Sequence, residues 1–261
     1  LIGAGYWGSN LLRDFYGLGV LRAVLETSEI LIQKHRVNYP DVVFYTSFDD
    51  MSKDLAITAV VVATPATTHY EICKRCLNRG YNLFVEKPLA LRYHEGDSLV
   101  SLAREKGLVL MVGHLLQYHP AIMKIRSMIG EGLVGKIQYI KSNRLNLGQV
   151  RTGENVLWSF APHDISVILS LLDNKLPNSV ICSGFSTLNP PISDCTTTIL
   201  HFDNQYAEIN VNWLYPYKEQ TLVIVGSMGM ITFKDSRTAP ELHYYRQPVS
   251  YNQDGVVVIN K

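Results

Sequence analysis

The chain has 261 residues, of which 47% are hydrophobic, and its formal net charge at pH 7 is +1. That length is sufficient for one or two domains with substantial cores. Basic and acidic residues nearly balance at 24 and 23, which excludes a strongly basic surface for nucleic acid, and no apolar run approaches the roughly 20 residues of a membrane span. We therefore predict a soluble globular protein that binds neither nucleic acid nor membrane.

The first residues carry a glycine pattern, G-x-G-x-x-G, that fits a tight turn between a strand and a helix. Its first glycine makes the turn, its second lets the backbone approach a pyrophosphate, and its third allows close packing, while the helix that follows directs N–H groups at the phosphates. An acidic residue ends the next apolar stretch at roughly the 20-residue spacing expected of a ribose-binding carboxylate. A plain structural turn is the alternative. The predicted cofactor-binding residues here are Gly3, Gly5, Tyr6, Trp7, Gly8 and Glu26.

Only two residues precede Gly3, whereas a first strand usually has about 5–6 residues. No initiator Met is present, and the sequence ends just after a strand-like stretch at residues 256–259. We expect residues to be missing at both ends.

Short apolar runs alternate with amphipathic helical patterns up to about residue 117. This alternation predicts right-handed crossovers and a doubly wound parallel sheet of the Rossmann type. The strands are expected over residues 21–25, 42–45, 58–63, 81–85 and 108–112, and the helices over 9–17, 30–38, 67–79 and 93–106.

The pattern changes after residue 118, where strands follow one another with few helices between them. This order predicts a mostly antiparallel sheet with helices on one face, and an open face that a homo-oligomer (a dimer or tetramer) would cover. We therefore divide the chain into an NAD(P)-binding domain (1–117) and a substrate-binding and oligomerisation α+β domain (118–261). The helices are expected over 121–129 and 162–172, and the strands over 137–147, 180–187, 196–202, 206–213, 220–225 and 230–233, with a hairpin at Asp203-Asn204.

Two of the four cysteines, Cys73 and Cys76, have C-x-x-C spacing inside a helical pattern. No second pair completes a zinc site, so we predict no metal and interpret the pair as half-buried helix cysteines. Reduced thiols favour the cytoplasm as the location.

Thr64 and Pro65 follow the buried strand of residues 58–63. Loops at the carboxyl ends of parallel strands line the ligand crevice, so this loop is expected to contact the nicotinamide ribose. The alternative to a cofactor contact is that Thr67 or Thr68 simply caps the next helix. Thr64, Pro65 and His69 are candidate cofactor-binding residues. The pattern around His69, taken by itself, predicts a residue on the helix surface.

Glu86-Lys87-Pro88 directly follows the strand of residues 81–85. A lysine in a dry crevice has a lowered pKa that frees it for proton transfer, Glu86 would hold its ammonium, and Pro88 would stiffen the turn through a cis bond. The alternative is a surface turn with a solvated ion pair.

These motifs, in this order and spacing, resemble those of the Gfo/Idh/MocA oxidoreductases, and the match continues through Tyr118-His119-Pro120 and the stretch from Trp158 to Asp164. The resemblance implies an NAD(P)-binding domain followed by an open-faced sheet domain, and oxidation or reduction of sugars or polyols. It also implies that Lys87 and His163 face the substrate carbinol as catalytic residues, and that Glu86 and Lys87 adjoin the cofactor.

His163 lies at the start of the helix predicted over 162–172, where an imidazole can take a hydroxyl proton near neutral pH. Without the resemblance it is equally a helix-cap residue, and which of Lys87 and His163 is the base stays open. Many family members carry an aspartate where this chain has Ser159, and Asp164 points about 100° away from His163 on a helix.

The stretch from Arg144 to Arg151 looks like the nucleotide-sugar branch of the family, similar to UDP-N-acetylglucosaminuronate 3-dehydrogenases. Its two arginines would meet a diphosphate or carboxylate, with surface arginines as the alternative. The candidate substrate-binding residues are Lys87, Tyr118, Arg144, Asn146, Arg151, Ser159 and His163.

Glu26 favours NAD over NADP because a carboxylate accepts from ribose hydroxyls and repels a 2′-phosphate. We therefore predict an NAD-dependent oxidoreductase acting on the ring carbinol of a sugar, such as a UDP-linked N-acetylhexosamine or its uronate. The alternatives are a free-sugar or inositol dehydrogenase and a non-catalytic NAD-binding sensor.

Overall fold

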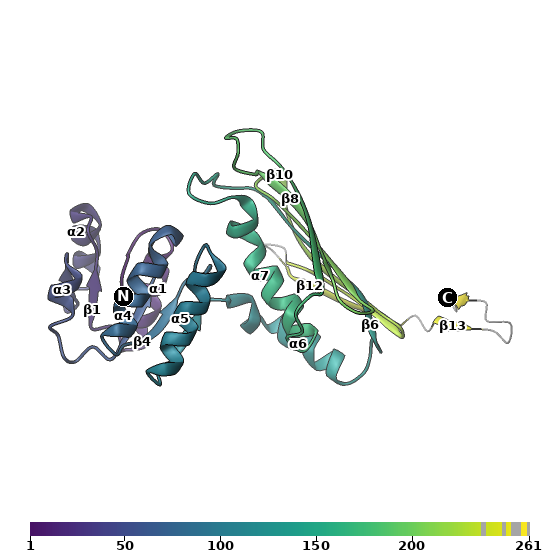
Figure 1. The fold of residues 1–261 in the computed structure, drawn as a ribbon, viewed down its shortest axis with the longest axis horizontal. Helices are drawn as coiled ribbons and strands as arrows, with labels where there is room; N and C mark the ends of the chain where they lie inside the picture. The colour runs from purple at the N-terminus through teal and green to yellow at the C-terminus, as the bar shows by residue number, and fades with distance from the viewer. Residues whose placement is uncertain (236–238, 247–248, 252–256, 260–261) are drawn as a thin grey trace. The chain divides into compact units, whose positions relative to one another are not determined.

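The computed structural model describes residues 1–235, 239–246, 249–251 and 257–259. Two compact units divide the chain, residues 1–113 and 114–261 (Figure 1). The sequence placed this division after residue 117. The difference arises because the short helix η2 (Leu115–Tyr118) packs against the helices of the second unit.

The first unit is built on parallel strands. β1 pairs with β2, and β3, β4 and β5 pair in sequence, while Ile2 bridges Leu25 and Val62 in parallel and so joins the two sets. The resulting order, β2-β1-Ile2-β3-β4-β5, is that of a dinucleotide-binding doubly wound sheet, as predicted. The strands are β1 (Ala23–Leu25), β2 (Val43–Tyr45), β3 (Ala59–Val62), β4 (Asn82–Val85) and β5 (Leu110–Val112).

Helices cover both faces of this sheet. One apolar cluster joins Leu11 and Leu12 of the first helix to Val24, and a second joins the later helices to Val60 and Val62. The predicted helices are present within a few residues of their expected ends. The helices are α1 (Gly8–Gly17), α2 (Glu29–Asn38), α3 (Phe48–Met51), η1 (Ala66–Thr68), α4 (His69–Asn78) and α5 (Tyr93–Glu105).

The sequence did not predict α3, whose four residues are too short to show a helical period. The Ser47 hydroxyl accepts hydrogen bonds from the N–H groups of Asp49 and Asp50 and so begins this helix. Cys73 and Cys76 lie on α4 as predicted, but they are fully rather than half buried, and this burial raises the pKa of each thiol to about 12.

The second unit is built on one seven-stranded sheet with the order β12-β11-β10-β6-β9-β8-β7. All neighbours in it are antiparallel except β6 and β9, which are parallel. β13 and β14 pair separately, and residue 256 of the strand expected over 256–259 lies outside the described residues. The strands are β6 (Ile137–Leu147), β7 (Ser179–Phe185), β8 (Cys195–His201), β9 (Tyr206–Asn212), β10 (Leu214–Gly226), β11 (Gly229–Lys234), β12 (Glu241–Arg246), β13 (Val249–Tyr251) and β14 (Val257–Ile259).

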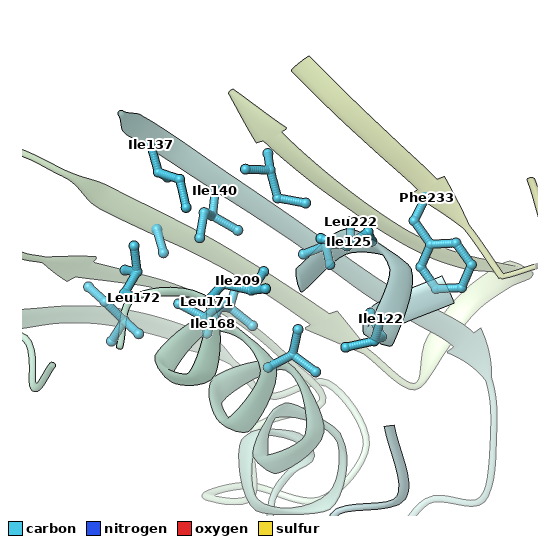
Figure 2. Packing of buried hydrophobic residues seen from close by; sticks show 14 of the residues in the cluster. Ile122, Ile125, Ile137, Ile140, Ile168, Leu171, Leu172, Ile209, Leu222 and Phe233 are labelled. Carbon is cyan, nitrogen blue, oxygen red and sulfur yellow. The ribbon is translucent and has the colours of Figure 1, made fainter. Parts of the chain in front are cut away.

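Two helices, α6 (Pro120–Gly130) and α7 (Val156–Leu171), pack on one face of this sheet. Figure 2 shows Ile122 and Ile168 from these helices among apolar residues of the strands, such as Ile209. The core of the second unit therefore lies between α6, α7 and the sheet.

The predicted start of α7 at residue 162 is wrong. The helix begins at Val156 because the Asn155 side chain accepts a hydrogen bond from the N–H of Trp158, and Pro162 lies inside it. His163 is consequently in the interior of a helix and not at its N-terminus.

The other face of the sheet carries no helix among the described residues (Figure 1). A row of hydrogen bonds crosses four strands there: Thr197 donates to Asn210 (2.8 Å), Asn210 to Asn143 (3.2 Å), and Asn143 to Glu219 (2.7 Å). In the part of the chain that the structure describes, no helix has the length and apolar character needed to cross a membrane.

Candidate functional site

The glycine turn between Ile2 and α1 leaves no room for side chains at its first and third glycines. Gly3 has a φ of +86°, and a Cβ added to Gly8 would lie 2.2 Å from the carbonyl oxygen of Gly3. Around Gly5, by contrast, no atom of the described residues other than its chain neighbours lies within 4 Å of the position of a Cβ. The turn is therefore tight at its ends and open at its middle glycine, as a ligand-binding turn requires.

The carboxylate of Glu26 holds this turn from the end of β1. Its Oε2 accepts a hydrogen bond from the N–H of Ala4 (2.8 Å), and its Oε1 accepts from the N–H groups of Thr27 (2.8 Å) and Ser28 (3.0 Å). Glu26 is 9% exposed. The predicted ribose ligand thus also anchors the glycine turn.

His35 of α2 holds the same residue, Ala4, at its carbonyl. Its Nε2 lies 2.9 Å from the carbonyl oxygen of Ala4 and donates to it, because a carbonyl oxygen can only accept. Sequence reasoning missed His35, whose partner is 31 residues away and leaves no local pattern.

Trp7 and Glu86 connect the glycine turn to the segment after β4. Trp7 Nε1 donates to Oε1 of Glu86 (2.7 Å), and Oε2 of Glu86 accepts from the N–H of Lys87 (3.3 Å). Burial raises the pKa of Glu86, and the hydrogen bonds from Trp7 and Lys87 act in the opposite direction. Glu86 therefore anchors an indole and a backbone N–H, and the charge of Lys87 also acts to lower its pKa. That Glu86 holds the Lys87 ammonium stays a prediction.

Lys87 is half-buried directly beyond the carboxyl end of β4, and its peptide bond to Pro88 is cis, as predicted. Gly113, which follows β5, lies against this segment: a Cβ there would be 3.0 Å from Oε1 of Glu86. Gly113 and the Glu86 side chain therefore pack closely next to Lys87.

His69 is not on the helix surface, as its pattern alone indicated. Its side chain is 1% exposed, with Nδ1 at 2.7 Å from the carbonyl oxygen of Pro88 and Nε2 at 2.9 Å from that of Thr64. Thr67 and Thr68, the alternative helix caps, do not cap α4 through their side chains. Thr68 is the N-cap residue, but its hydroxyl donates to the carbonyl oxygen of Pro65 (2.7 Å). The first unit thus brings together the predicted residues of the glycine turn and of the segments after β1, β3 and β4.

In the second unit, Ser159 and His163 lie four residues apart on α7, a spacing that places them on one face of the helix. Ser159 is buried, His163 is partly buried, and Tyr118 at the end of η2 is exposed. The predicted convergence of Lys87 and His163 joins residues of different units and stays a prediction.

Arg144, expected to meet a substrate anion, has an internal partner. Its Nε donates to Oδ2 of Asp164 (2.7 Å) and its Nη2 to Oδ1 (3.1 Å), while Ser142 Oγ donates to the same Oδ1 (2.7 Å). Asp164 is 5% exposed. Arg144 therefore forms a bidentate buried ion pair between β6 and α7, which neither the substrate prediction nor the surface alternative anticipated.

The other predicted residues of this stretch lie toward the end of β6 and in the loop after it. Arg151 Nε is 3.2 Å from Oε1 of Glu154, in a pair whose arginine is half exposed. Asn146 is partly buried on β6, and its Nδ2 is 3.3 Å from the position of a Cβ on Gly148.

Both units match known sequence families, in the order in which they occur. Residues 1–114 match an oxidoreductase family with an NAD-binding Rossmann fold, and residues 122–232 match the GFO/IDH/MocA C-terminal domain. The chain belongs to the Gfo/Idh/MocA family of oxidoreductases. Its first unit is accordingly an NAD-binding Rossmann domain, as the glycine pattern predicted.

Proteins named for enzymatic activities are similar to this chain. It is 24% identical to 2,7-anhydro-N-acetylneuraminate hydratase of Mediterraneibacter gnavus over 88% of the chain and 65% of that protein. It is 31% identical to UDP-N-acetylglucosamine 3-dehydrogenase of Acidithiobacillus ferrooxidans over 57% of the chain and 46% of that enzyme. The chain thus spans about half to two thirds of the length of these relatives.

The fold is also that of the WlbA dehydrogenase of Bordetella pertussis, a structure solved in complex with NADH and UDP-GlcNAcA. The TM-score is 0.85 at 19% identity, over 97% of this chain and 77% of that one. This likeness shows that the chain has the same fold as that dehydrogenase.

The residues of the first unit fit NAD. The middle of the glycine turn is open, and α1 begins at Gly8 without a side-chain cap among the described residues. The anionic carboxylate of Glu26 stands at the end of β1, where a ribose hydroxyl donates in this fold. Gly3, Gly5 and Gly8 would hold the pyrophosphate, and Glu26 the adenine ribose.

Proposed function

We propose that this Gfo/Idh/MocA chain is an NAD-dependent dehydrogenase that moves a hydride between a sugar ring carbinol and nicotinamide. The observation that carries the proposal is Lys87, placed at the carboxyl end of β4 by Glu86 and Pro88 within an NAD-binding unit. In open parallel sheets, ligands bind beyond these strand ends. A UDP-linked N-acetylhexosamine or its uronate is the proposed substrate, supported by the similarity to two UDP-sugar proteins.

The proposed roles follow from the chemistry of each group. Bound nicotinamide supplies the hydride acceptor or donor. The carbinol proton goes to Lys87 or His163, since a neutral amine and a neutral imidazole each have a lone pair that accepts it. Ser159, which stands where many family members have an aspartate, favours a nucleotide sugar over a free sugar or inositol.

Glu26 supports a preference for NAD over NADP. Its carboxylate would lie beside the 2′ position of the ribose and repel a phosphate there, while its three backbone N–H partners hold it in place.

The second unit is proposed to mediate self-association through the sheet face that lacks helices, in a protein of the cytoplasm. This face combines the polar row of Asn143 and Asn210 with apolar groups such as the tilted rings of Tyr139 and Tyr206, whose centroids lie 4.6 Å apart. A copy of the same chain would cover both. Light scattering is expected to show a dimer or tetramer that dissociates in Tyr206→Lys; a monomeric wild type would refute this part.

The activity test mixes the purified chain with NAD and a panel of UDP-sugars, free hexoses and inositol, and follows NADH absorbance. Turnover of a UDP-sugar supports the proposal, and turnover of only a free sugar or inositol would identify the alternative dehydrogenase. Tight NAD binding without turnover of any substrate would identify a sensor.

Lys87→Ala is expected to abolish turnover while NAD binding persists. Lys106→Ala, which alters an exposed lysine after α5, is the matched control. Unchanged turnover in Lys87→Ala would remove the proposed role of Lys87.

A further inference from the structure

His69 is the first residue of α4, yet its imidazole points into the protein. It is 1% exposed, which is unusual for a polar ring at the end of a helix in an α/β domain. Buried polar groups are normally hydrogen-bonded, and the partners of this ring identify what it does.

Both ring nitrogens of His69 face backbone carbonyl oxygens. The first belongs to Thr64, in the loop after β3, and lies 2.9 Å from Nε2. The second belongs to Pro88, the last residue of the Glu86-Lys87-Pro88 segment after β4, and lies 2.7 Å from Nδ1. One side chain thus spans the two segments that leave neighbouring strands of the sheet.

These two contacts restrict the protonation state of the His69 ring. Carbonyl oxygens only accept hydrogen bonds, so both bonds exist together only when both nitrogens of the ring carry protons. A ring with one proton would hold one segment and leave a lone pair facing the other oxygen. A ring with both protons would place a positive charge near Glu86, and a charge on His69 acts to lower the pKa of that carboxyl, against the effect of burial.

The carbonyl of Pro88 is one residue beyond Lys87, and the backbone of the segment is also held through the N–H of Lys87 at Glu86. The backbones of the Thr64-Pro65 loop and of the segment that carries Lys87 are therefore joined through His69 at two points, the carbonyls of Thr64 and Pro88.

We propose that His69 is a positioning residue that, as a doubly protonated imidazole, fixes the Lys87-Pro88 segment against the Thr64-Pro65 loop. It acts through backbone carbonyls and does not touch the cofactor, in contrast to its prediction as a cofactor ligand. The kinetic consequence rests on the proposed function, because Lys87 is there the group that faces the carbinol.

The direct test is hydrogen–deuterium exchange on the purified chain. In His69→Ala, and to a smaller extent in His69→Gln, which keeps one donor group, the peptides covering residues 64–68 and 86–91 should exchange faster together. His94→Ala, at an exposed histidine in the first turn of α5, is the control and should change neither. Exchange that rises in only one segment, or in neither, would overturn the proposal. Nitrogen NMR of the wild-type ring should show protons on both nitrogens, and a single protonated nitrogen would equally overturn it.

The kinetic test uses the sugar that the wild type turns over. His69→Ala should lower kcat by about tenfold or more, because small displacements of a catalytic group are costly, while the Kd for NADH changes little. His69→Gln should recover part of kcat. A Kd that weakens as much as kcat falls would instead assign His69 to cofactor binding. If the wild type turns over no sugar, the proposed function fails, and the exchange experiment still decides the role of His69. Should His69→Ala not fold, His69→Gln carries both measurements.

Discussion

The indole Nε1 of Trp7 donates a 2.7 Å hydrogen bond to Oε1 of Glu86, and so ties the glycine turn to the segment that carries Lys87. The two residues are 79 positions apart in the sequence. A buried carboxylate whose charged form is disfavoured therefore links the cofactor-binding turn to the proposed catalytic lysine.

The first prediction concerns the pH dependence of stability at Glu86. Burial raises the pKa of its carboxyl in the folded chain above the value of about 4.3 expected when unfolded. Its contribution is therefore greatest below the unfolded pKa and is lost as the pH rises through the folded pKa. The free energy of unfolding of the wild type, relative to Glu86→Gln, should fall as the pH rises from about 4 toward neutrality. Urea titrations at several pH values measure this difference, and a difference that grows with pH would contradict the assignment.

The second prediction separates folding from cofactor binding at Gly5. Because no atom of the described residues other than its chain neighbours lies within 4 Å of its Cβ position, Gly5→Ala should leave the melting temperature nearly unchanged. The added methyl group would meet the pyrophosphate, so the Kd for NADH should rise by about tenfold or more, or about 1.4 kcal/mol. Gly17→Ala, at an equally open position in α1, is the control and should bind NADH as the wild type does. Equal affinities in the two variants would show that the pyrophosphate does not approach Gly5.

The third prediction concerns the choice between NAD and NADP at Glu26. Glu26→Gln keeps one accepting oxygen, for either Ala4 or the N–H groups of Thr27 and Ser28, but removes the negative charge. The affinity for NAD should fall and that for NADP should rise, so that the ratio of the two Kd values changes by about tenfold. Calorimetry with both cofactors measures this ratio of Kd values. Glu29→Gln, an exposed carboxyl in the first turn of α2, serves as the comparison, and an unaltered ratio in Glu26→Gln would argue against ribose recognition by Glu26.

The fourth prediction compares two arginines of the second unit. Arg144→Met leaves the Asp164 carboxylate buried without its bidentate partner, which should cost about 3–5 kcal/mol of stability. Arg151→Met removes a single contact between a half-exposed arginine and the largely buried Glu154 carboxylate, and it should cost less than Arg144→Met. Denaturant unfolding of both variants gives the comparison. Equal losses would mean that the two pairs have similar environments.

The parallel sheet of the first unit was predictable because each of its strands is a short apolar run ended by a loop. Gly80, at a φ of +83°, shows how a single residue can mark the end of α4. The start of α7 was misplaced because a proline is typical of the first turn of a helix, whereas Pro162 lies in the interior. β12 was missed because Glu241–Arg246 offers few apolar residues at a strand spacing.

The partners of individual polar residues could not be predicted from the sequence. His69 reaches Pro88 over 19 positions and Arg144 reaches Asp164 over 20, and neither separation corresponds to a local helical or strand period. The tight turn of the glycine pattern was located correctly along the chain. The internal contacts of Glu86, His69 and Arg144 depend on how separate elements pack, which local patterns do not encode.

The backbone of Ala4 is clamped on both sides, by Glu26 at its N–H and by His35 at its carbonyl. Such a clamp makes the turn preorganised: the conformational entropy of this loop is lost when the protein folds and need not be lost again when a dinucleotide arrives. The pocket for the cofactor should accordingly have the same shape before and after association, and the ordering that accompanies binding should fall mainly on the ligand.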